Sequence, residues 1–508
     1  MAGAGKRYLQ LEGKRDPFLR RAREAAKLTI PALLPSDNHS GGSVLPTPFQ
    51  GLGARGVNNL ASKLLLALLP PNSAFFRLTI DDFTLEQMTQ REGMRAEVEE
   101  ALGKIERACT SEIETTAVRV TAGEVLKHLL VTGNALMYVP TQGNVKMFRL
   151  DRYVVSRDPM GNVLEIIVKE SISPKLLPAE MGITDEGNDL NPDRTVDIFT
   201  HIHLSPDGKK WVVYQEVKEQ VVPGSEGDYP LDKTPWIPLR FTKIDGEDYG
   251  RGYVEEYYGD LRSLEALTQA IVEGSAASAK VLFLVNPNGV TQQKTLTEAP
   301  NGAVRAGSAE DVSVLQVEKF ADFRVAFETI EAISSRLSYA FLLNSAVQRT
   351  GERVTAEEIR YMANELEAAM GGVYSILSLE FQLPLVRTIM HRLEKQRRIP
   401  SLPKGTVRPA ITTGLEALGR GNDLNKLDLF LQGAAQALGP EVLMQRLNVG
   451  DYLTRRATAL GIDAKGLILS DEEFQAKQEE EMGQTMQMAM AGTGMDMATE
   501  VVKGAMKQ

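Results

Sequence analysis

The most informative stretch of the sequence is YVEEYYGDLRSLEALTQAIVEGSAASA, residues 253–279. Apolar or small side chains recur in it at steps of four and three residues, the spacing of one helix face: Tyr257, Leu261, Leu264, Thr268 and Ile271. The stretch therefore predicts a helix over 253–279, which would be about 40 Å long. A cluster of small residues near its end, 274–278, would let a neighbouring backbone approach closely.

A second helix is predicted over 322–345. Its apolar face is formed by Phe323, Phe327, Ile330, Leu337 and Phe341. The segment between the two helices, 280–321, has strand-like ends and a turn at 286–289. Two long helices that bracket a compact insert predict a hairpin-like stalk with a small domain at its tip.

The first half of the chain combines helices with an antiparallel β region. Residues 16–127 are helical in pattern with breaks, including a short strand-like run at 75–80. Strands are then predicted at 135–139, 145–150, 153–156, 163–169, 195–204 and 210–217, with turns at 158–162 and 205–208. The arrangement predicts an α+β fold that is mainly α.

The last third of the chain is predicted to be helical. Thr355-Ala-Glu-Glu358 is a capping box that starts a helix. This helix would run on to about 411, bent or broken at Gly371-Gly372 and Pro384. Residues 412–474 look like a small all-helical unit. The tail, 475–508, contains seven methionines but no aromatic residue, Leu or Ile, so it would be mobile or need partners.

Composition limits the classes of function. The 508 residues are 43% hydrophobic and 24% charged, with a net charge of −10. An acidic chain is a poor candidate for gripping nucleic acid over a broad basic surface, although DNA could still slide past it. The single cysteine, Cys109, excludes an intrachain disulfide, and we expect it to be buried. No secretory signal or membrane-spanning run is visible, which predicts a soluble protein made in a cytoplasm.

Two short motifs resemble the binding sites of enzymes, and the sequence around each of them argues against that function. Gly51-Leu-Gly-Ala-Arg-Gly56 matches a dinucleotide-binding fingerprint, so a soluble nucleotide-dependent enzyme is one alternative. Two prolines in the preceding residues, 45–50, make a poor central strand, and no repeated βαβ units follow. His201 and His203 share a strand face but lack further ligands at metal-site spacing. We therefore predict no catalytic residue, no cofactor and no metal.

The loop Gln348-Arg-Thr-Gly-Glu-Arg353 lies between two helices with apolar faces. Guanidinium groups form paired hydrogen bonds with phosphate oxygens, so Arg349 and Arg353 could contact DNA. A plain solvated connection between helices explains the same residues.

Six blocks of sequence resemble portal proteins of podoviruses of the Autographiviridae type. The blocks are 53–63 (GARGVNNLASK), 245–257 (DGEDYGRGYVEEY), 259–265 (GDLRSLE), 340–361 (AFLLNSAVQRTGERVTAEEIRY), 371–377 (GGVYSIL) and 414–421 (GLEALGRG). They occur in order over nearly the whole chain.

The resemblance implies a ring-forming phage portal fold. Its parts would be a wing (1–252), a first stem helix (253–279), an α/β clip (280–321) and a second stem helix (322–345). A tunnel loop (346–354), a wing helix (355–411), a helical crown (412–474) and the Met-rich tail (475–508) would follow.

The resemblance also implies a function and partners. Such proteins form a homo-dodecamer at one capsid vertex, where double-stranded DNA passes non-specifically during packaging and ejection. The implied partners are the terminase large subunit, the tail adaptor, the major capsid and scaffolding proteins, and internal head proteins, with no membrane involved. Gln348, Arg349, Thr350 and Arg353 would line the channel, and Lys280 is a weaker lumen candidate. A helical scaffold that never touches DNA is a further alternative.

Overall fold

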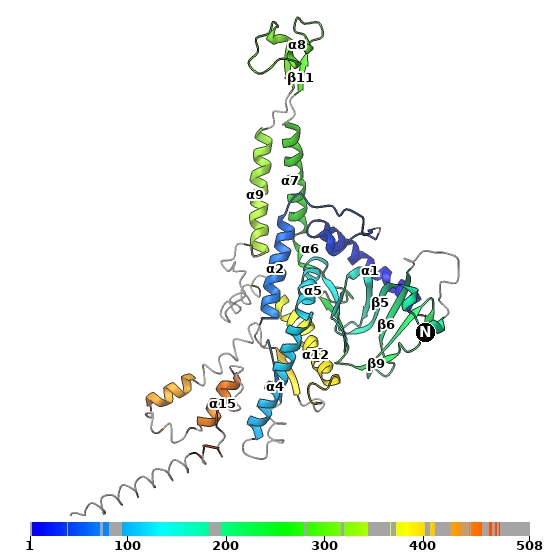
Figure 1. The fold of residues 1–508 in the computed structure, drawn as a ribbon, viewed down its shortest axis with the longest axis vertical. Coiled ribbons are helices and arrows are strands. Elements are labelled where there is room, and N and C mark those ends of the chain that lie inside the picture. Colours follow the sequence, from blue (N-terminus) through cyan, green and yellow to red (C-terminus); the bar gives the residue numbers. More distant parts are fainter. Residues whose placement is uncertain are drawn as a thin grey trace, which may run out of the picture. The chain divides into compact units, whose positions relative to one another are not determined.

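The computed structural model describes residues 3–37, 39–71, 75–80, 94–181, 195–278, 282–315, 320–343, 372–401, 407–411, 428–437 and 449–459, with isolated positions at 366 and between 439 and 477. The chain divides into two compact units. Unit 1 comprises Met1–Phe75 and Cys109–Pro400, and unit 2 comprises Phe76–Ala108 and Ser401–Gln508. Figure 1 labels the elements.

Two antiparallel sheets of unit 1 confirm the β region predicted for the first half of the chain. The larger has the order β4-β5-β6-β7, and both β8 and β9 pair with β7. Its strands are β4 (Tyr153–Arg157), β5 (Val163–Ile172), β6 (Val196–Leu204), β7 (Lys210–Val217), β8 (Gln220–Val221) and β9 (Gly227–Pro230). The smaller has the order β10-β2-β3, with β10 (Trp236–Arg240), β2 (Asn134–Tyr138) and β3 (Lys146–Phe148). Pro238 is tolerated because β10 is an edge strand.

Helix α1 (Ala4–Lys27) packs on the larger sheet. Its Tyr8 and Leu11 form a buried cluster with Val154 and Ile167, and Phe199 packs against them. These side chains come from neighbouring strands, so burying the apolar stripe of α1 also covers one face of the sheet.

Helices α2 (Leu52–Leu68) and α5 (Val118–Thr132) form the helical core of unit 1 (Figure 1). Gly133 ends α5 with φ +73, a conformation that glycine adopts without strain. A Cβ there would lie 2.4 Å from the carbonyl carbon of Arg251. The next residue, Asn134, exchanges two hydrogen bonds of 2.8 Å with the backbone of Gly250. A Cβ on Gly250 or Gly252 would likewise lie within 2.8 Å of the backbone of 130–133, so these two glycines allow the close approach.

The two predicted long helices are present with corrected boundaries. The first is interrupted at Tyr257, giving α6 (Tyr253–Glu256) and α7 (Tyr258–Ser278). The second, α9 (Phe320–Ala340), ends five residues before the predicted 345. Between them, β11 (Leu282–Val285) pairs antiparallel with β12 (Val312–Leu315), and α8 (Gln293–Thr297) lies in the connection.

The prediction of one helix over 355–411 was wrong at its C-terminal end, and 355–365 lies outside the described residues. Helix α11 (Val373–Leu377), the π-helix η6 (Ser378–Gln382) and α12 (Leu383–Lys395) follow one another, and a strand then occupies β13 (Val407–Ile411). Pro384 has no N–H to donate to the helical turn before it, and that turn takes the wider π form, so the helical run continues past the proline. Pro400 follows five residues after the end of α12, and a proline there is unfavourable for continuing the helix.

Unit 2 contains β1 (Phe76–Ile80) paired antiparallel with β13, part of α4 (Met94–Thr115), a helical stretch at 428–437 and α15 (Val449–Ala459). Arg456 and Tyr452 of α15 both bind Asp428, at 2.9 Å. The remaining short helices are 3-10 turns: η1 (Pro31–Leu33), η2 (Leu150–Arg152), η3 (Pro174–Leu176), η4 (Ala179–Met181) and η5 (Ala309–Asp311). In the described part of the chain, no helix is both long and apolar enough to cross a bilayer.

Candidate functional site

The predicted channel residues Gln348, Arg349, Thr350, Arg353 and Lys280 all lie outside the described residues. The structure does describe the elements from which these segments emerge. Helix α9 and the residues up to Leu343 precede the predicted loop, and α7 ends two residues before Lys280.

Helices α7 and α9 run antiparallel side by side and are called here the helix pair (Figure 1). Asp260, in the first turn of α7, binds Arg336 near the end of α9 at 2.8 Å. Leu261 and Leu264 of α7 are buried, as are Ile333 and Leu337 of α9. Burial of these apolar side chains stabilises the helix pair near the body of unit 1.

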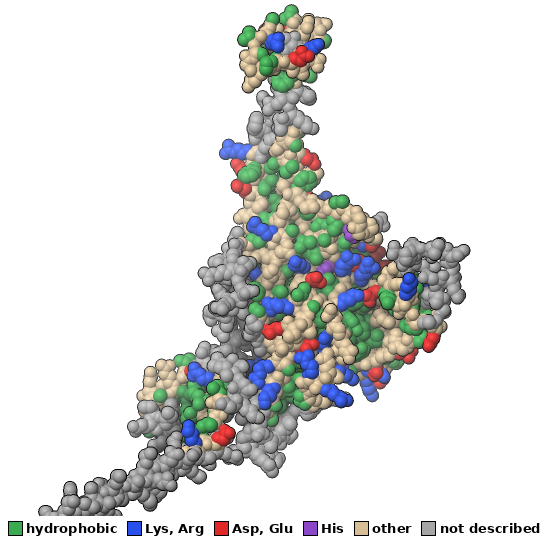
Figure 2. Space-filling view, viewed as in Figure 1, with side chains coloured by type: hydrophobic (Ala, Val, Ile, Leu, Met, Phe, Trp, Pro, Cys, Tyr) green, Lys and Arg blue, Asp and Glu red, His purple; other side chains and the backbone are tan. Residues whose placement is uncertain are grey.

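Large apolar side chains of the helix pair are also left exposed within one copy. Figure 2 shows hydrophobic side chains along this part of the chain. Val325 is 65% exposed, Phe327 55%, Tyr339 79% and Val272 of α7 49%. Val325 and Phe327 are two residues apart and so face roughly opposite sides of α9. Large apolar side chains are therefore exposed on more than one side of the helix pair, which is typical of a surface that other protein chains cover.

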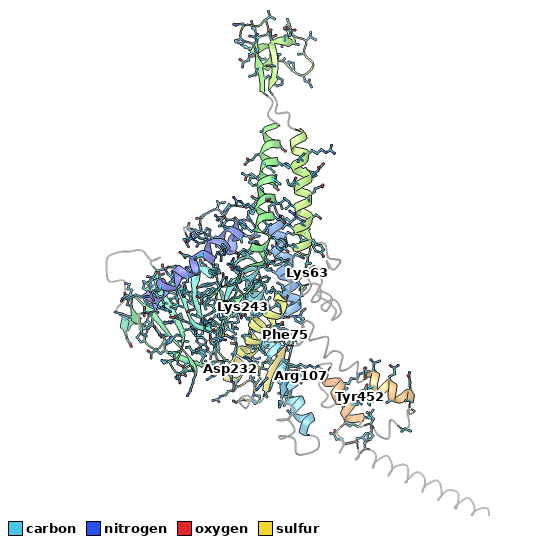
Figure 3. The ribbon with its side chains drawn as sticks, turned by 180° about the vertical axis from the view of Figure 1, so that it is seen from behind. Lys63, Phe75, Arg107, Asp232, Lys243 and Tyr452 are labelled. Atoms are coloured by element: carbon cyan, nitrogen blue, oxygen red, sulfur yellow. The ribbon has the colours of Figure 1, made fainter. Side chains whose placement is uncertain are left out.

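Helix α2 holds the end of α9. The Asn59 Nδ2 atom donates to the carbonyl oxygens of Phe341, at 2.9 Å, and Leu342, at 3.0 Å. The Lys63 ammonium donates to the Leu342 oxygen at 3.0 Å. Lys63, which is labelled in Figure 3, is only 5% exposed. Its charge lies at the negative end of a helix dipole, where a cation is stabilised.

The Gly51–Gly56 motif serves helix packing. The residues before it, 45–50, form no strand, so the βαβ context of a dinucleotide site is missing. A Cβ on Gly53 would lie 2.5 Å from the Leu28 oxygen, and one on Gly56 would lie 2.5 Å from the Phe341 ring. Both glycines therefore allow α2 to approach its neighbours closely.

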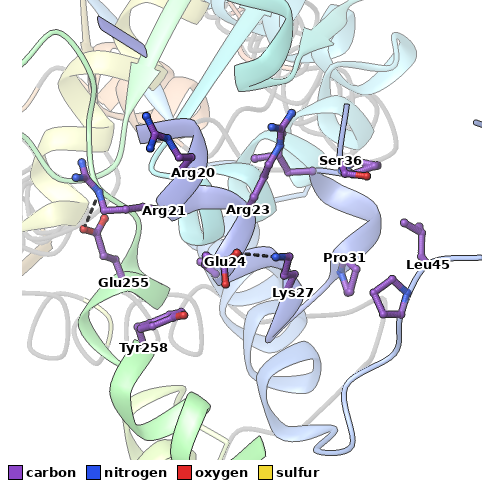
Figure 4. A pocket seen from close by; sticks show the side chains of 14 residues that line it. Arg20, Arg21, Arg23, Glu24, Lys27, Pro31, Ser36, Leu45, Glu255 and Tyr258 are labelled. Atoms are coloured by element: carbon purple, nitrogen blue, oxygen red, sulfur yellow. Dashed lines mark hydrogen bonds and ion pairs between the residues drawn. The ribbon is translucent and has the colours of Figure 1, made fainter. Parts of the chain in front are cut away.

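A cavity of about 670 Å³ beside α1 is lined by several basic side chains (Figure 4). Arg21 pairs with Glu255 at 3.3 Å, Lys27 with Glu24 at 2.6 Å, and Arg23 with Asp37. The hydrogen bond from Arg23 holds the pKa of Asp37 below its ordinary value. Three of the four basic side chains that line the cavity are already paired, and only Arg20 is exposed without an ion pair to the described part of the chain, so few cations here are free to bind phosphate.

His201 and His203 lie on one face of β6, as predicted, with ring centroids 4.8 Å apart. The two ring nitrogens of His201 are hydrogen-bonded to Glu165 and Tyr214, both at 2.8 Å. Burial alone would raise the pKa of Glu165, but its hydrogen bonds with His201 and Arg7 outweigh this and lower the pKa to about 2. No group of three potential metal ligands occurs among the described residues. The cluster instead ties α1 to the sheet through Arg7.

The segment 282–315 is held by polar contacts. Thr291 is its one buried residue among the side chains that are described. The Thr291 N–H donates to the Asp311 carboxylate at 3.0 Å, and the Ser308 N–H donates to the Thr291 hydroxyl at 2.8 Å. Phe283, at 66% exposed, and Val304, at 98%, are uncovered. Among the described side chains of this segment, polar contacts therefore outnumber buried apolar ones.

The sequence pattern of the family described as bacteriophage head to tail connecting protein matches residues 2–468. The chain belongs to this family. It is 47% identical to the portal protein of Escherichia phage T7, over 96% of this chain and 91% of that protein. The portal protein of Enterobacteria phage T3 is also 47% identical, over 95% and 91%, and that of Enterobacteria phage SP6 is 31% identical, over 97% and 95%. As a head-to-tail connecting protein, the chain is a structural component of the virion and not an enzyme.

Similarity to solved structures is weak. A chain in the neck of an empty GTA particle is 9% identical, with a TM-score of 0.38, over 82% of this chain and 90% of that chain.

Proposed function

We propose that the chain is the portal subunit of a podovirus, and that twelve copies close into a ring at one capsid vertex. Double-stranded DNA passes through the ring during genome packaging and ejection. The helix pair carries the proposal, because its exposed apolar residues need a cover that a neighbouring copy supplies. In a cyclic head-to-tail assembly each copy covers the next, so no such surface is left over.

The proposal assigns each part of a portal to a segment of the chain. The sheets with α1, α2 and α5 form the wing, the helix pair forms the stem, and 282–315 forms the clip. The 346–354 segment is the tunnel loop, 412–474 the crown, and 475–508 the tail. The clip contacts the terminase large subunit during packaging and the tail adaptor afterwards. The other contacts are with major capsid and scaffolding proteins and with internal head proteins.

An acidic subunit suits this role, because strong cationic lining would hold DNA in place. In the proposal, Arg349 and Arg353 offer a few phosphate contacts at the narrowest point of the channel. Lys280 offers a further phosphate contact in the part of the channel formed by the stem. Contacts to phosphate read no base sequence, so passage is non-specific. A separate ATPase supplies the energy for packaging, and assembly takes place in the cytoplasm of the bacterial host.

The experiment replaces Arg349 and Arg353 with Glu and follows two quantities. Ring formation, measured by native mass, should be unchanged, because these residues are not part of the helix pair. DNA packaged or retained per particle should fall. Unchanged packaging would favour a connector whose loop does not contact DNA, and loss of the rings would show that the loop is structural.

A further inference from the structure

The C-terminus of α9 is closed by an unusual set of contacts. The N–H of Leu343 donates to the Ser338 oxygen at 2.8 Å, and the N–H of Leu342 donates to the Tyr339 oxygen at 3.0 Å. This is the Schellman pattern, in which the residue after the helix cap takes a left-handed conformation and is usually glycine. Here that residue is Leu342, with φ +51. A leucine in this region costs about 1–2 kcal/mol.

Side chains from other elements hold this strained end. The carbonyl oxygens beyond the Schellman bonds are those of Ala340, Phe341 and Leu342. Tyr253 donates its hydroxyl to the Ala340 oxygen at 2.9 Å. The other two oxygens accept from Asn59 and Lys63, as described above. Every carbonyl at this end therefore has a donor, and two of the three donors come from one face of α2.

Steric fit adds to these hydrogen bonds. Asn59 and Lys63 are four residues apart, and Gly56 lies one turn before Asn59, so all three share one helix face. The ring of Phe341 occupies the space that a Cβ on Gly56 would take. Phe341 itself is fully buried. The same face of α2 thus combines a donor pair with a recess for the residue that ends α9.

We infer that Asn59 and Lys63 are positioning residues that fix where the chain leaves α9, and with it the start of the segment that carries Arg349 and Arg353. The helix pair alone would not fix where α9 ends, because a leucine such as Leu342 does not by itself favour the left-handed conformation that it adopts here. The inference rests on the proposed function only in the role that it gives to this segment. It assigns α2, and not the helix pair, the task of placing the constriction.

The test uses two nearly isosteric variants that remove the donors, Asn59→Leu and Lys63→Met. The matched control is Asn58→Leu, because Asn58 is the preceding residue of α2 and is exposed. Hydrogen exchange is measured on the assembled protein at the amides of 341–343 and, for comparison, inside α9 at 330–337. Loss of the clamp should speed exchange at 341–343 about tenfold or more, while exchange inside α9 stays unchanged, because the lost hydrogen bonds hold only the end of this helix.

Unchanged exchange at 341–343 in both variants would overturn the inference, as would equal acceleration throughout α9, which would mean a merely structural role. DNA retention is measured on the same particles and addresses the proposed function separately. Faster exchange with reduced retention supports both claims. If exchange is faster in Lys63→Met while Arg349→Glu and Arg353→Glu retain DNA normally, the clamp stands and the channel role of the loop fails.

Discussion

Glu216 of β7 holds the amino end of α1. Its carboxylate accepts the N–H groups of Ala4 at 2.8 Å and Gly5 at 2.9 Å, and the side chain is buried. A carboxylate there satisfies free helix donors and interacts favourably with the helix dipole. The contact joins residues more than 200 positions apart.

We expect Glu216→Gln to lower the free energy of unfolding by about 1–2 kcal/mol, since a charged acceptor becomes a neutral one. Hydrogen exchange at 4–8 should accelerate. Glu219→Gln is the control, because Glu219 forms only an exposed ion pair with Lys6, which solvent screens. Equal effects of both variants would show that Glu216 does not hold α1.

His128 is a buried residue of α5 whose protonation should set part of the acid sensitivity. Burial lowers its pKa to about 4, from an ordinary value of 6.5. The unfolded chain therefore binds a proton below pH 6.5 that the native protein does not, and stability falls as the pH drops from 6.5 towards 4. The loss approaches about 3 kcal/mol.

Replacing His128 with Leu should flatten this part of the profile of thermal midpoint against pH. The control is His39→Leu, which removes an exposed histidine and should leave the profile as it is. Parallel profiles for the wild type and His128→Leu between pH 6.5 and 4 would contradict the assignment.

At the scale of elements, the helix pair depends on a small buried seam. Leu337 of α9 is fully buried, whereas Val325 of the same helix is 65% exposed. Leu337→Ala should destabilise the unassembled chain by about 2–5 kcal/mol through lost burial and a cavity. Val325→Ala should change it by about 0.5 kcal/mol or less. Denaturant unfolding of the unassembled chain measures both, and similar values would mean that α9 is not packed through Leu337.

Local sequence predicted most elements but not where some of them end. Strands such as β5 and β6 were predictable because β-branched residues and turns mark them directly. The end of α9 was not predictable, because no glycine or proline stands directly after Ala340. The helix end depends on the hydrogen bond from Asn59 to Phe341, two residues that are 282 positions apart in the sequence. Strand β13 was missed for the same reason, because its partner β1 lies over 300 positions away.

The sequence predicted the functional residues less completely than it predicted the helices and strands. The loop around Arg349 stays a prediction, because it falls outside the described residues. Neither Asn59 nor Lys63 was predicted to have a role, although Lys63 lies within the apolar run 60–69. That run was the available signal, since a lysine buried among leucines needs a hydrogen-bond partner. The sequence could indicate that Lys63 is unusual but not that its partner is Leu342.

At the scale of the whole molecule, the exposed face of α9 should decide assembly. Phe327→Lys places a charge on a side chain that is 55% exposed in one copy and would be covered in a ring. The isolated chain should keep its stability, while the yield of rings falls. Glu331→Lys, one turn further on at an exposed position, is the control for added positive charge. An undiminished ring yield in Phe327→Lys would place the contact between copies elsewhere.

The most direct test of the account is imaging of the purified protein viewed end-on, combined with its native mass. We predict a closed ring with a central hole and a mass near twelve times the 55.8 kDa of one chain. Single copies or pairs without a hole, at concentrations where related connectors assemble, would contradict the claim that the helix pairs of neighbouring copies enclose a DNA channel.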